Sequence, residues 1–329
     1  MKTVGVNISH DSSFCRCVNG EVSVFLEEER LSRRKHDEIP TQVLLELLEE
    51  GDELNFTGLE YEGRSLKDDI DNICRYILKS EAKFLGHREH HIFHTACGFY
   101  NSGFEEADVV VVDGMGNCYD DEYHECASIW HCKKPHDIQL IEHQVTMKYG
   151  GGEHLGMEQH QHWPMGIGMV YAGVSAFLRF GELGSGKTMG LAPYGKEDRN
   201  IKPFLLDDGR IDSTLFYRTK GGAHFIPYDY LPKHWDYRNW NEDVQRVANL
   251  AYRLQKDFEE WMTSFILKCD HENIVLSGGC ALNCVANYEY LKHLPKNVNL
   301  YIEPVSNDAG TSIGLAKLLY HKRWKQLKS

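Results

Sequence analysis

The pattern of apolar and polar positions predicts a protein that contains β-sheet. Short aliphatic runs with the length of buried strands occur at residues 3–9, 108–113, 273–277 and 300–303. Each run is followed at once by small polar or glycine residues, which favour turns. Residues 21–27 follow the Asn19-Gly20 pair, a favoured hairpin turn, so we expect the chain to open with a hairpin.

Apolar residues spaced three and four apart predict the helices that connect these strands. They fall at residues 41–50, 66–79, 169–179 and 244–269. Because helices alternate with strands, we predict an α/β fold with a mostly parallel sheet. Parallel strands place their carboxyl ends at one edge, where α/β folds gather ligand sites. The polar residues that follow the strands should therefore converge on one cleft.

Length and charge narrow the class of protein. At 329 residues the chain is long enough for two lobes. Acidic residues outnumber basic ones by 49 to 36, and the net charge of −13 argues against nucleic-acid binding that depends mainly on neutralising phosphates. The ten cysteines are scattered without paired CxxC units, so neither a disulfide framework nor a structural zinc site is indicated.

The N-terminal residues lead directly into the first predicted strand, without the apolar region of a signal peptide. No apolar run of about eighteen residues, long enough to span a bilayer, is present. We therefore expect a cytoplasmic protein with reduced thiols and no membrane partner.

His90 and His94 are the first candidate metal ligands. Their spacing of four places both imidazoles on one face of a helix, a common way to hold a transition metal. Taken alone, such a pair is more often solvated or hydrogen-bonded. Asp113 and Asp308, each after a predicted strand, can complete a shell that suits iron, manganese or zinc. An HExxH protease site is excluded, because His91 stands where the glutamate should be.

Residues 181–188 match the phosphate-binding pattern GxxxxGK[ST], with Lys187 as its lysine. A true P-loop follows a buried strand and opens a helix. The preceding residues 170–180 have helical spacing instead, so we do not predict a P-loop ATPase. Lys187 remains a candidate phosphate contact.

Two other strand ends carry candidate chemistry. Gly278 and Gly279 follow the third strand, where backbone amides can approach a nucleotide closely, although an ordinary tight turn is the alternative. Cys280 beside them has no identifiable partner base, so a nucleophilic role is not supported. Asp11, with His10, follows the first strand as a candidate acid–base or substrate-orienting residue, and a turn or capping aspartate is the alternative.

Taken in order, these segments resemble the NodU/CmcH/TobZ-type O-carbamoyltransferase family, whose catalytic domain is similar to TsaD, the tRNA threonylcarbamoyl transferase. The resemblance spans nearly the whole chain and rests on several short motifs. These are His10-Asp11-Ser12-Ser13, Glu27 to Arg33 with Lys35-His36-Asp37, His90 to His94 with Phe99-Tyr100, Asp113 to Gly116, Met189 to Gly195, Ser277 to Asn287, and Asn307 to Gly314.

The resemblance implies an α/β fold of the actin-like ATPase type (ASKHA, RNase H-like), with two lobes around a metal and nucleotide cleft. Residues 1–104 with about 300–329 would form the N-terminal lobe. Residues 105–299 would form the C-terminal lobe, which carries a long Gly/His-rich insert at about 148–196. Typical members continue into a YrdC-like domain that makes carbamoyladenylate, and we expect no such domain in this chain.

The resemblance also implies roles for individual residues. The matches to the family's metal ligands are His90, His94, Asp113 and Asp308. Asp11, with His10 beside it, matches the residue that positions or deprotonates the acceptor hydroxyl. The matches to the nucleotide-binding and phosphate-binding segments are Gly278, Gly279, Asn283, Asn307 and Lys187.

The implied reaction starts from carbamoyl phosphate and ATP, which give carbamoyladenylate, and the carbamoyl group then passes to an acceptor hydroxyl. A divalent metal, Fe²⁺ in preference to Mn²⁺ or Zn²⁺, would act as a Lewis acid. Either this chain performs both half-reactions or a separate protein supplies the carbamoyladenylate.

A compact, single-module version of this family suggests a protein of a bacterial or phage-infected cell. In that setting the hydroxymethyl group of 5-hydroxymethylcytosine in DNA is a candidate acceptor. Apart from the short run Arg33-Arg34-Lys35 no basic stripe is evident, so the net charge of −13 weighs against DNA. The alternatives are a small-molecule or sugar hydroxyl, TsaD-like transfer to tRNA, and a non-catalytic nucleotide-binding partner subunit.

Overall fold

The computed structural model describes residues 1–49, 52–58, 72–78, 82–84, 90–116, 118–119, 123–147, 161–163, 165–219, 222–233 and 241–328. Much of the predicted helix at 66–79 lies outside these residues, and its described part, Ile73–Leu78, is a π-helix. Residues 148–160 of the predicted insert also lie outside the described residues.

The first part of the chain forms a five-stranded sheet in the order β3-β2-β1-β4-β5. Its strands are β1 (Lys2–Ile8), β2 (Ser13–Val18), β3 (Glu21–Glu27), β4 (Leu54–Gly58) and β5 (Ala82–Phe84). The Asn19-Gly20 turn joins β3 to β2, not to β1 as the prediction of an opening hairpin implied. The hydrophobic pattern does not predict β2, because this strand buries the polar side chains of Ser13 and Arg16.

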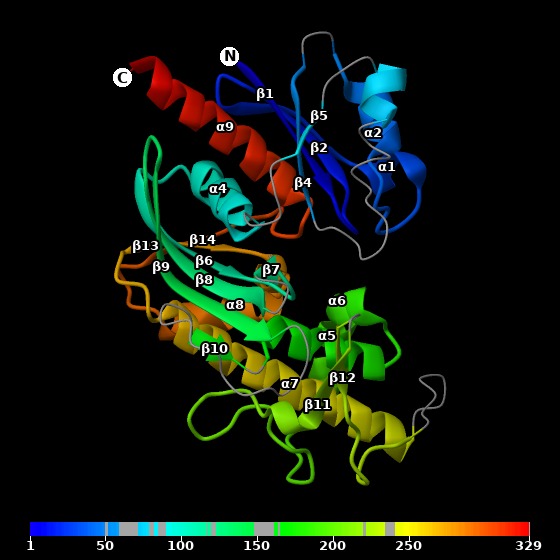
Figure 1. The fold of residues 1–329 in the computed structure, drawn as a ribbon. Helices are drawn as coiled ribbons and strands as arrows, with labels where there is room; N and C mark the ends of the chain where they lie inside the picture. The colour runs from blue at the N-terminus through cyan, green and yellow to red at the C-terminus, as the bar shows by residue number, and fades with distance from the viewer. Residues whose placement is uncertain are drawn as a thin grey trace.

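A seven-stranded sheet, in the order β10-β9-β8-β6-β13-β14 with β7 beside β8, is the second sheet of the fold (Figure 1). Its strands are β6 (Glu106–Val112), β7 (Cys118–Tyr119), β8 (Tyr123–Lys133), β9 (Asp137–Met147), β10 (Gln161–Trp163), β13 (Asn273–Ser277) and β14 (Asn299–Ile302). β13 is parallel to β6 and β14, whereas β8 is antiparallel to β6 and β9. The prediction of a mostly parallel sheet is therefore wrong: this sheet is mixed, because β6, β8 and β9 are connected without crossover helices.

Two helices, α4 (His90–Ser102) and α9 (Gly310–Lys328), lie between the two sheets (Figure 1). α9 packs on β1 and β2, and α4 packs on both α9 and the larger sheet. Val109 and Val111 of β6 join the core around α4, and Val110 and Val112 join the core on the opposite face. Because successive side chains of a strand point to opposite faces, a strand buried on both faces is a continuous apolar run.

The opposite face of the larger sheet is covered mainly by α7 (Glu242–Ile266), with α5 (Ile167–Phe177) and α8 (Cys284–His293). Asn241 caps α7 by accepting hydrogen bonds from the amides of Asp243 and Val244. Other elements among the described residues are α1 (Glu28–Ser32), α2 (Thr41–Leu47), α6 (Ser185–Leu191), the short helices Glu182–Gly184, Ala192–Tyr194, Ser213–Leu215 and Gly279–Leu282, and the hairpin of β11 (Phe216–Thr219) and β12 (Gly222–Phe225).

β14 pairs with β13 in the larger sheet, whereas α9 packs on the smaller one. The predicted lobe boundary near residue 300 thus falls within a strand of the larger sheet, and the lobe boundaries stay a prediction. Within the described ranges, the chain has no helix that is both long enough and apolar enough to cross a membrane.

Candidate metal centre

The order of the elements brings four of the predicted site residues to one edge of the larger sheet. Asp113 follows β6 and Asp308 follows β14, and both strands run parallel to β13 between them. α4 precedes β6 and returns antiparallel to it, so His90, at the start of α4, lies above this carboxyl edge. The start of α9 is tied to the smaller sheet, because Ser13 Oγ of β2 donates to the carbonyl of Ala309, the residue before α9, at 2.8 Å. The carboxyl edge of the larger sheet therefore lies beside the start of α9, which contacts the smaller sheet.

The side chains of His90, His94, Asp113 and Asp308 converge, with one ligand atom of each lying within 4.8 Å of the others. His90 Nε2 is 3.0 Å from Asp113 Oδ2 and 3.1 Å from His94 Nε2. The shared Asp308 Oδ1 lies 3.5 Å from His90 Nε2 and 3.6 Å from His94 Nε2. The Gly114 amide donates to Asp113 Oδ1 at 2.7 Å, which turns Oδ2 toward the histidines.

The electrostatics of the four residues favour a bound cation. Burial alone would lower the pKa of His90 and His94, but the Asp308 and Asp113 carboxylates outweigh burial and raise both pKa values. Burial likewise opposes ionisation of the two aspartates, but the histidines hold their pKa values below the usual range. Two imidazole nitrogens and two carboxylate oxygens fit iron, manganese or zinc. The four residues therefore fit a divalent transition metal by both charge and ligand type.

A second cluster, formed by His10, Asp11 and His36, stands beside this centre. Asp11 Oδ1 lies 2.9 Å from His36 Nδ1, and Asp11 Oδ2 lies 3.2 Å from His10 Nδ1 and accepts from Asn307 Nδ2 at 3.1 Å. His10 Nε2 is 3.7 Å from Asp308 Oδ2. Asp308 thus turns one oxygen toward His90 and His94, the candidate metal ligands, and the other toward His10.

The side chains around Asp11 favour its ionised form. Burial alone would raise the pKa of Asp11, but hydrogen bonds from His10 and His36 outweigh burial and lower this pKa. Burial alone would lower the pKa of His10, but Asp11, Asp308 and Asp113 raise it to about 9. His36 lies in one of the family motifs, but its contact with Asp11 joins residues 25 apart in the sequence, so no local pattern indicates its role.

Three of the residues predicted to bind a nucleotide, Gly278, Asn283 and Asn307, each contact a different part of the protein. Gly278 has φ +87°, and a Cβ there would stand 2.4 Å from the Val112 carbonyl oxygen, so the turn itself requires glycine. Asn283 caps α8 and exchanges hydrogen bonds of 3.0 Å with Gln255. Asn307 donates a hydrogen bond to Asp11 and so belongs to the Asp11 cluster. These contacts give Gly278, Asn283 and Asn307 structural partners whether or not a nucleotide binds.

Gly279 and Lys187 complete the predicted set. A Cβ on Gly279 would stand 3.0 Å from Asp113 Oδ1, so this glycine lies against the candidate metal centre. Lys187 is exposed on α6, and the residues before it are helical, which agrees with the absence of a P-loop context. Cys280 is buried, and burial raises the pKa of its thiol well above the ordinary value, which does not favour a nucleophilic role.

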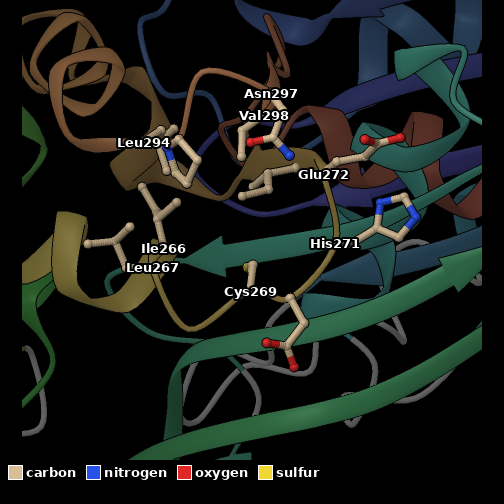
Figure 2. Close-up of a pocket in the computed structure, with 11 residues that line it drawn as sticks. Ile266, Leu267, Cys269, His271, Glu272, Leu294, Asn297 and Val298 are labelled. Atoms are coloured by element: carbon tan, nitrogen blue, oxygen red, sulfur yellow. The ribbon is translucent and has the colours of Figure 1, made fainter.

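Figure 2 shows a separate pocket, lined by the end of α7, the segment leading into β13 and the segment before β14. Ile266, His271, Leu294 and Val298 are among its lining residues. The pocket lies at the amino end of β13, whereas Gly278 follows the carboxyl end. None of the predicted site residues lines it.

The fold is that of the actin-like ATPases, as the sequence analysis predicted. The solved structure of HypF from T. kodakarensis is similar to this chain, with a TM-score of 0.56 and 12% sequence identity. The similarity covers 98% of this chain and 48% of that HypF chain.

Within this fold class, residues 53–317 match the family described as Carbamoyltransferase N-terminus, and the chain belongs to that family. The resemblance found in the motifs is thereby confirmed. The chain is 27% identical to protein sll1178 of Synechocystis, over 95% of this chain and 56% of that protein. It is 23% identical to the nodulation protein NolNO of Sinorhizobium fredii, over 94% of this chain and 46% of NolNO. The chain thus spans about half the length of these curated relatives.

Proposed function

We propose that this chain transfers a carbamoyl group to an acceptor hydroxyl at the candidate metal centre. The observation that carries the proposal is the convergence of His90, His94, Asp113 and Asp308 in a member of the carbamoyltransferase family. The Asp11 cluster adjoins these four residues through the 3.7 Å approach of His10 to Asp308. A metal-binding group and a candidate acid–base group therefore stand side by side.

The proposed donor is carbamoyladenylate, made from carbamoyl phosphate and ATP. The acceptor oxygen would form a bond to the carbamoyl carbon as the bond from that carbon to the phosphate oxygen breaks and AMP leaves. Gly278, Gly279, Asn283, Asn307 and Lys187 are the proposed nucleotide-side residues, and Gly279 is supported by its position beside Asp113. The donor is formed either by this chain or by a separate protein.

The proposed metal is Fe²⁺, with Mn²⁺ or Zn²⁺ as alternatives, held by the four converging residues. When bound, it would supply Lewis-acid stabilisation of negative charge that develops during transfer. Asp11 would orient the acceptor hydroxyl or take its proton, since its carboxylate is ionised and lies beside the centre. His36 and Asn307 would hold that carboxylate in place through contacts of 2.9 and 3.1 Å.

The proposed acceptor is the hydroxymethyl group of 5-hydroxymethylcytosine in phage-type DNA. Arg33, Arg34 and Lys35 support a polyanionic acceptor, because these exposed cations directly precede His36, which contacts Asp11. The net charge of −13 weighs against DNA. A small-molecule or sugar hydroxyl is the main alternative acceptor, in keeping with the relationship to a nodulation protein.

Two further alternatives are TsaD-like threonylcarbamoyl transfer to tRNA and a non-catalytic nucleotide-binding partner subunit. Incubating the chain with Fe²⁺, ATP and carbamoyl phosphate, then measuring AMP, tests for formation and turnover of the donor. Supplying carbamoyladenylate directly tests the transfer step by itself. No transfer from this donor to any hydroxyl acceptor would refute the proposed transfer and leave the tRNA and partner-subunit alternatives.

Mass spectrometry of a panel of candidate acceptors, each incubated with the protein, the metal and the donor, would identify the acceptor. The panel contains a 5-hydroxymethylcytosine oligonucleotide, its unmodified cytosine counterpart and free sugars, each with carbamoyladenylate, and tRNA with threonylcarbamoyladenylate as its donor. We expect the mass of one carbamoyl group on the hydroxymethylated oligonucleotide alone. Gain of that mass by a sugar but not by the oligonucleotide would refute the DNA assignment and retain carbamoyl transfer.

A further inference from the structure

We infer that His91, Ser128, Glu125 and His143 form a buried scaffold that sets the position of the metal ligands His90 and Asp113. The inference rests on the metal assignment in the proposed function and goes beyond it, because none of the four is one of the metal ligands assigned above. They are positioning residues. All four side chains are buried between α4 and the larger sheet.

The first link of the scaffold holds α4 on β8. His91 follows His90 in α4, and its Nδ1 lies 2.7 Å from Ser128 Oγ. Trp130 Nε1 donates to the same oxygen at 2.8 Å, which leaves the serine hydroxyl hydrogen free to donate to His91. The turn of α4 that carries His90 is thereby fixed on the strand.

The second link holds the loop that follows Asp113. The Gly116 amide donates to the Glu125 carbonyl on β8 at 2.7 Å. A Cβ on Gly116 would stand 2.9 Å from both Glu125 Oε2 and His91 Nε2, so the loop passes directly against these two side chains. Glu125 is itself fixed by His143 of β9, whose Nε2 lies 2.9 Å from Glu125 Oε1.

The two links share β8 as their base. His90 is placed by the contact of His91 with Ser128, and Asp113 by the contacts of Gly116 with Glu125. The separation of 3.0 Å between His90 Nε2 and Asp113 Oδ2 is thus set by buried contacts outside the ligand set. Residues behind a metal site commonly change its affinity about 10- to 100-fold when they are replaced.

The test measures Co²⁺ binding by metal-free full-length chain, because the visible spectrum of Co²⁺ reports ligand geometry as well as occupancy. Ser128→Ala removes the hydroxyl that holds His91, and Glu125→Gln removes the charge that holds His143. We expect both variants to bind Co²⁺ at least about tenfold more weakly, with a changed spectrum. The measurement is made well below the melting temperature of each variant, and if one variant does not fold the other serves alone.

Ser175→Ala is the matched control. Ser175 is also a buried serine with two hydrogen-bond partners, the Tyr171 carbonyl and Thr188 Oγ1, but it lies on α5. This variant should keep the wild-type affinity and spectrum even if it loses stability. Wild-type affinity and spectrum in Ser128→Ala and Glu125→Gln would overturn the scaffold and leave the metal centre intact. Absence of Co²⁺ binding by the wild type would overturn the metal assignment and the scaffold together.

Discussion

Replacing Asp52 by Asn should destabilise the five-stranded sheet through the buried side chain of Arg16. Asp52 Oδ2 is 2.7 Å from Arg16 Nη2, and its Oδ1 is 2.7 Å from Lys2 Nζ. The Glu49 amide also donates to Oδ2, at 3.0 Å. The Asp52 side chain is fully buried and that of Arg16 is nearly so. The asparagine amide would remove one carboxylate oxygen and leave a buried guanidinium incompletely paired.

The expected loss is about 3 kcal/mol of unfolding free energy, the lower end of the range for breaking a buried ion pair. The lower end applies because Glu49, which is largely exposed, still pairs with Arg16 Nη1 at 2.9 Å. Burial alone would raise the pKa of Asp52, but hydrogen bonds from Arg16 and Lys2 outweigh burial and lower it. The stabilisation by Asp52 is therefore complete above its unfolded-state pKa of about 3.9 and is lost as the pH falls through its folded-state pKa.

Urea denaturation followed by circular dichroism measures this loss at several pH values. The difference between wild type and variant should be constant from about pH 6 to 8 and shrink below about pH 4. Asp208→Asn is the control, because the Asp208–Arg210 pair is exposed and its loss should leave the midpoint unchanged. An unchanged midpoint for Asp52→Asn at neutral pH would refute the reasoning.

Three other changes test the turn, the metal and the Asp11 cluster. Gly278→Ala should cost about 2 kcal/mol or more, because the residue has φ +87° and its Cβ would meet the Val112 carbonyl at 2.4 Å; a urea midpoint equal to wild type would contradict this. Co²⁺ at about 100 times its dissociation constant should stabilise the wild type by about 2.7 kcal/mol and His94→Ala by much less, and an equal rise in melting temperature would remove His94 from the ligand set. His36→Ala should lower the transfer kcat up to about 100-fold without weakening Co²⁺ binding, since His36 holds Asp11; an unchanged kcat would show that this contact is not needed.

The sequence predicted the strand ends well, because a strand buried on both faces is an uninterrupted aliphatic run whose end is plain. Asp113 and Gly278 follow such runs in β6 and β13, which are parallel neighbours. Their convergence with His90 follows from the reversal of the chain between α4 and β6. The positions of the predicted strands and helices were therefore enough to predict that the four candidate ligands converge.

Other features depend on contacts that no local pattern reports. β2 was missed because Arg16 is buried by pairing with Asp52, which is 36 residues away. The role of Asn307 is another case, since its amide contacts Asp11 across 296 residues. His91 is a third case, since it contacts Ser128 behind the site across 37 residues. In each case a polar side chain pairs with a partner distant in the sequence, so hydrophobic periodicity carries no sign of the contact.

The central claim is that His90, His94, Asp113 and Asp308 hold a metal on which carbamoyl transfer depends. The most direct measurement compares wild type with His90→Ala, each supplied with Fe²⁺, carbamoyladenylate and the acceptor panel, and follows carbamoyl mass on the acceptors. His90 is one of the four converging residues. A circular dichroism melt of the His90→Ala variant is the control for folding. The account predicts product with the wild type and none with the variant. Product at the wild-type rate from folded His90→Ala would contradict it.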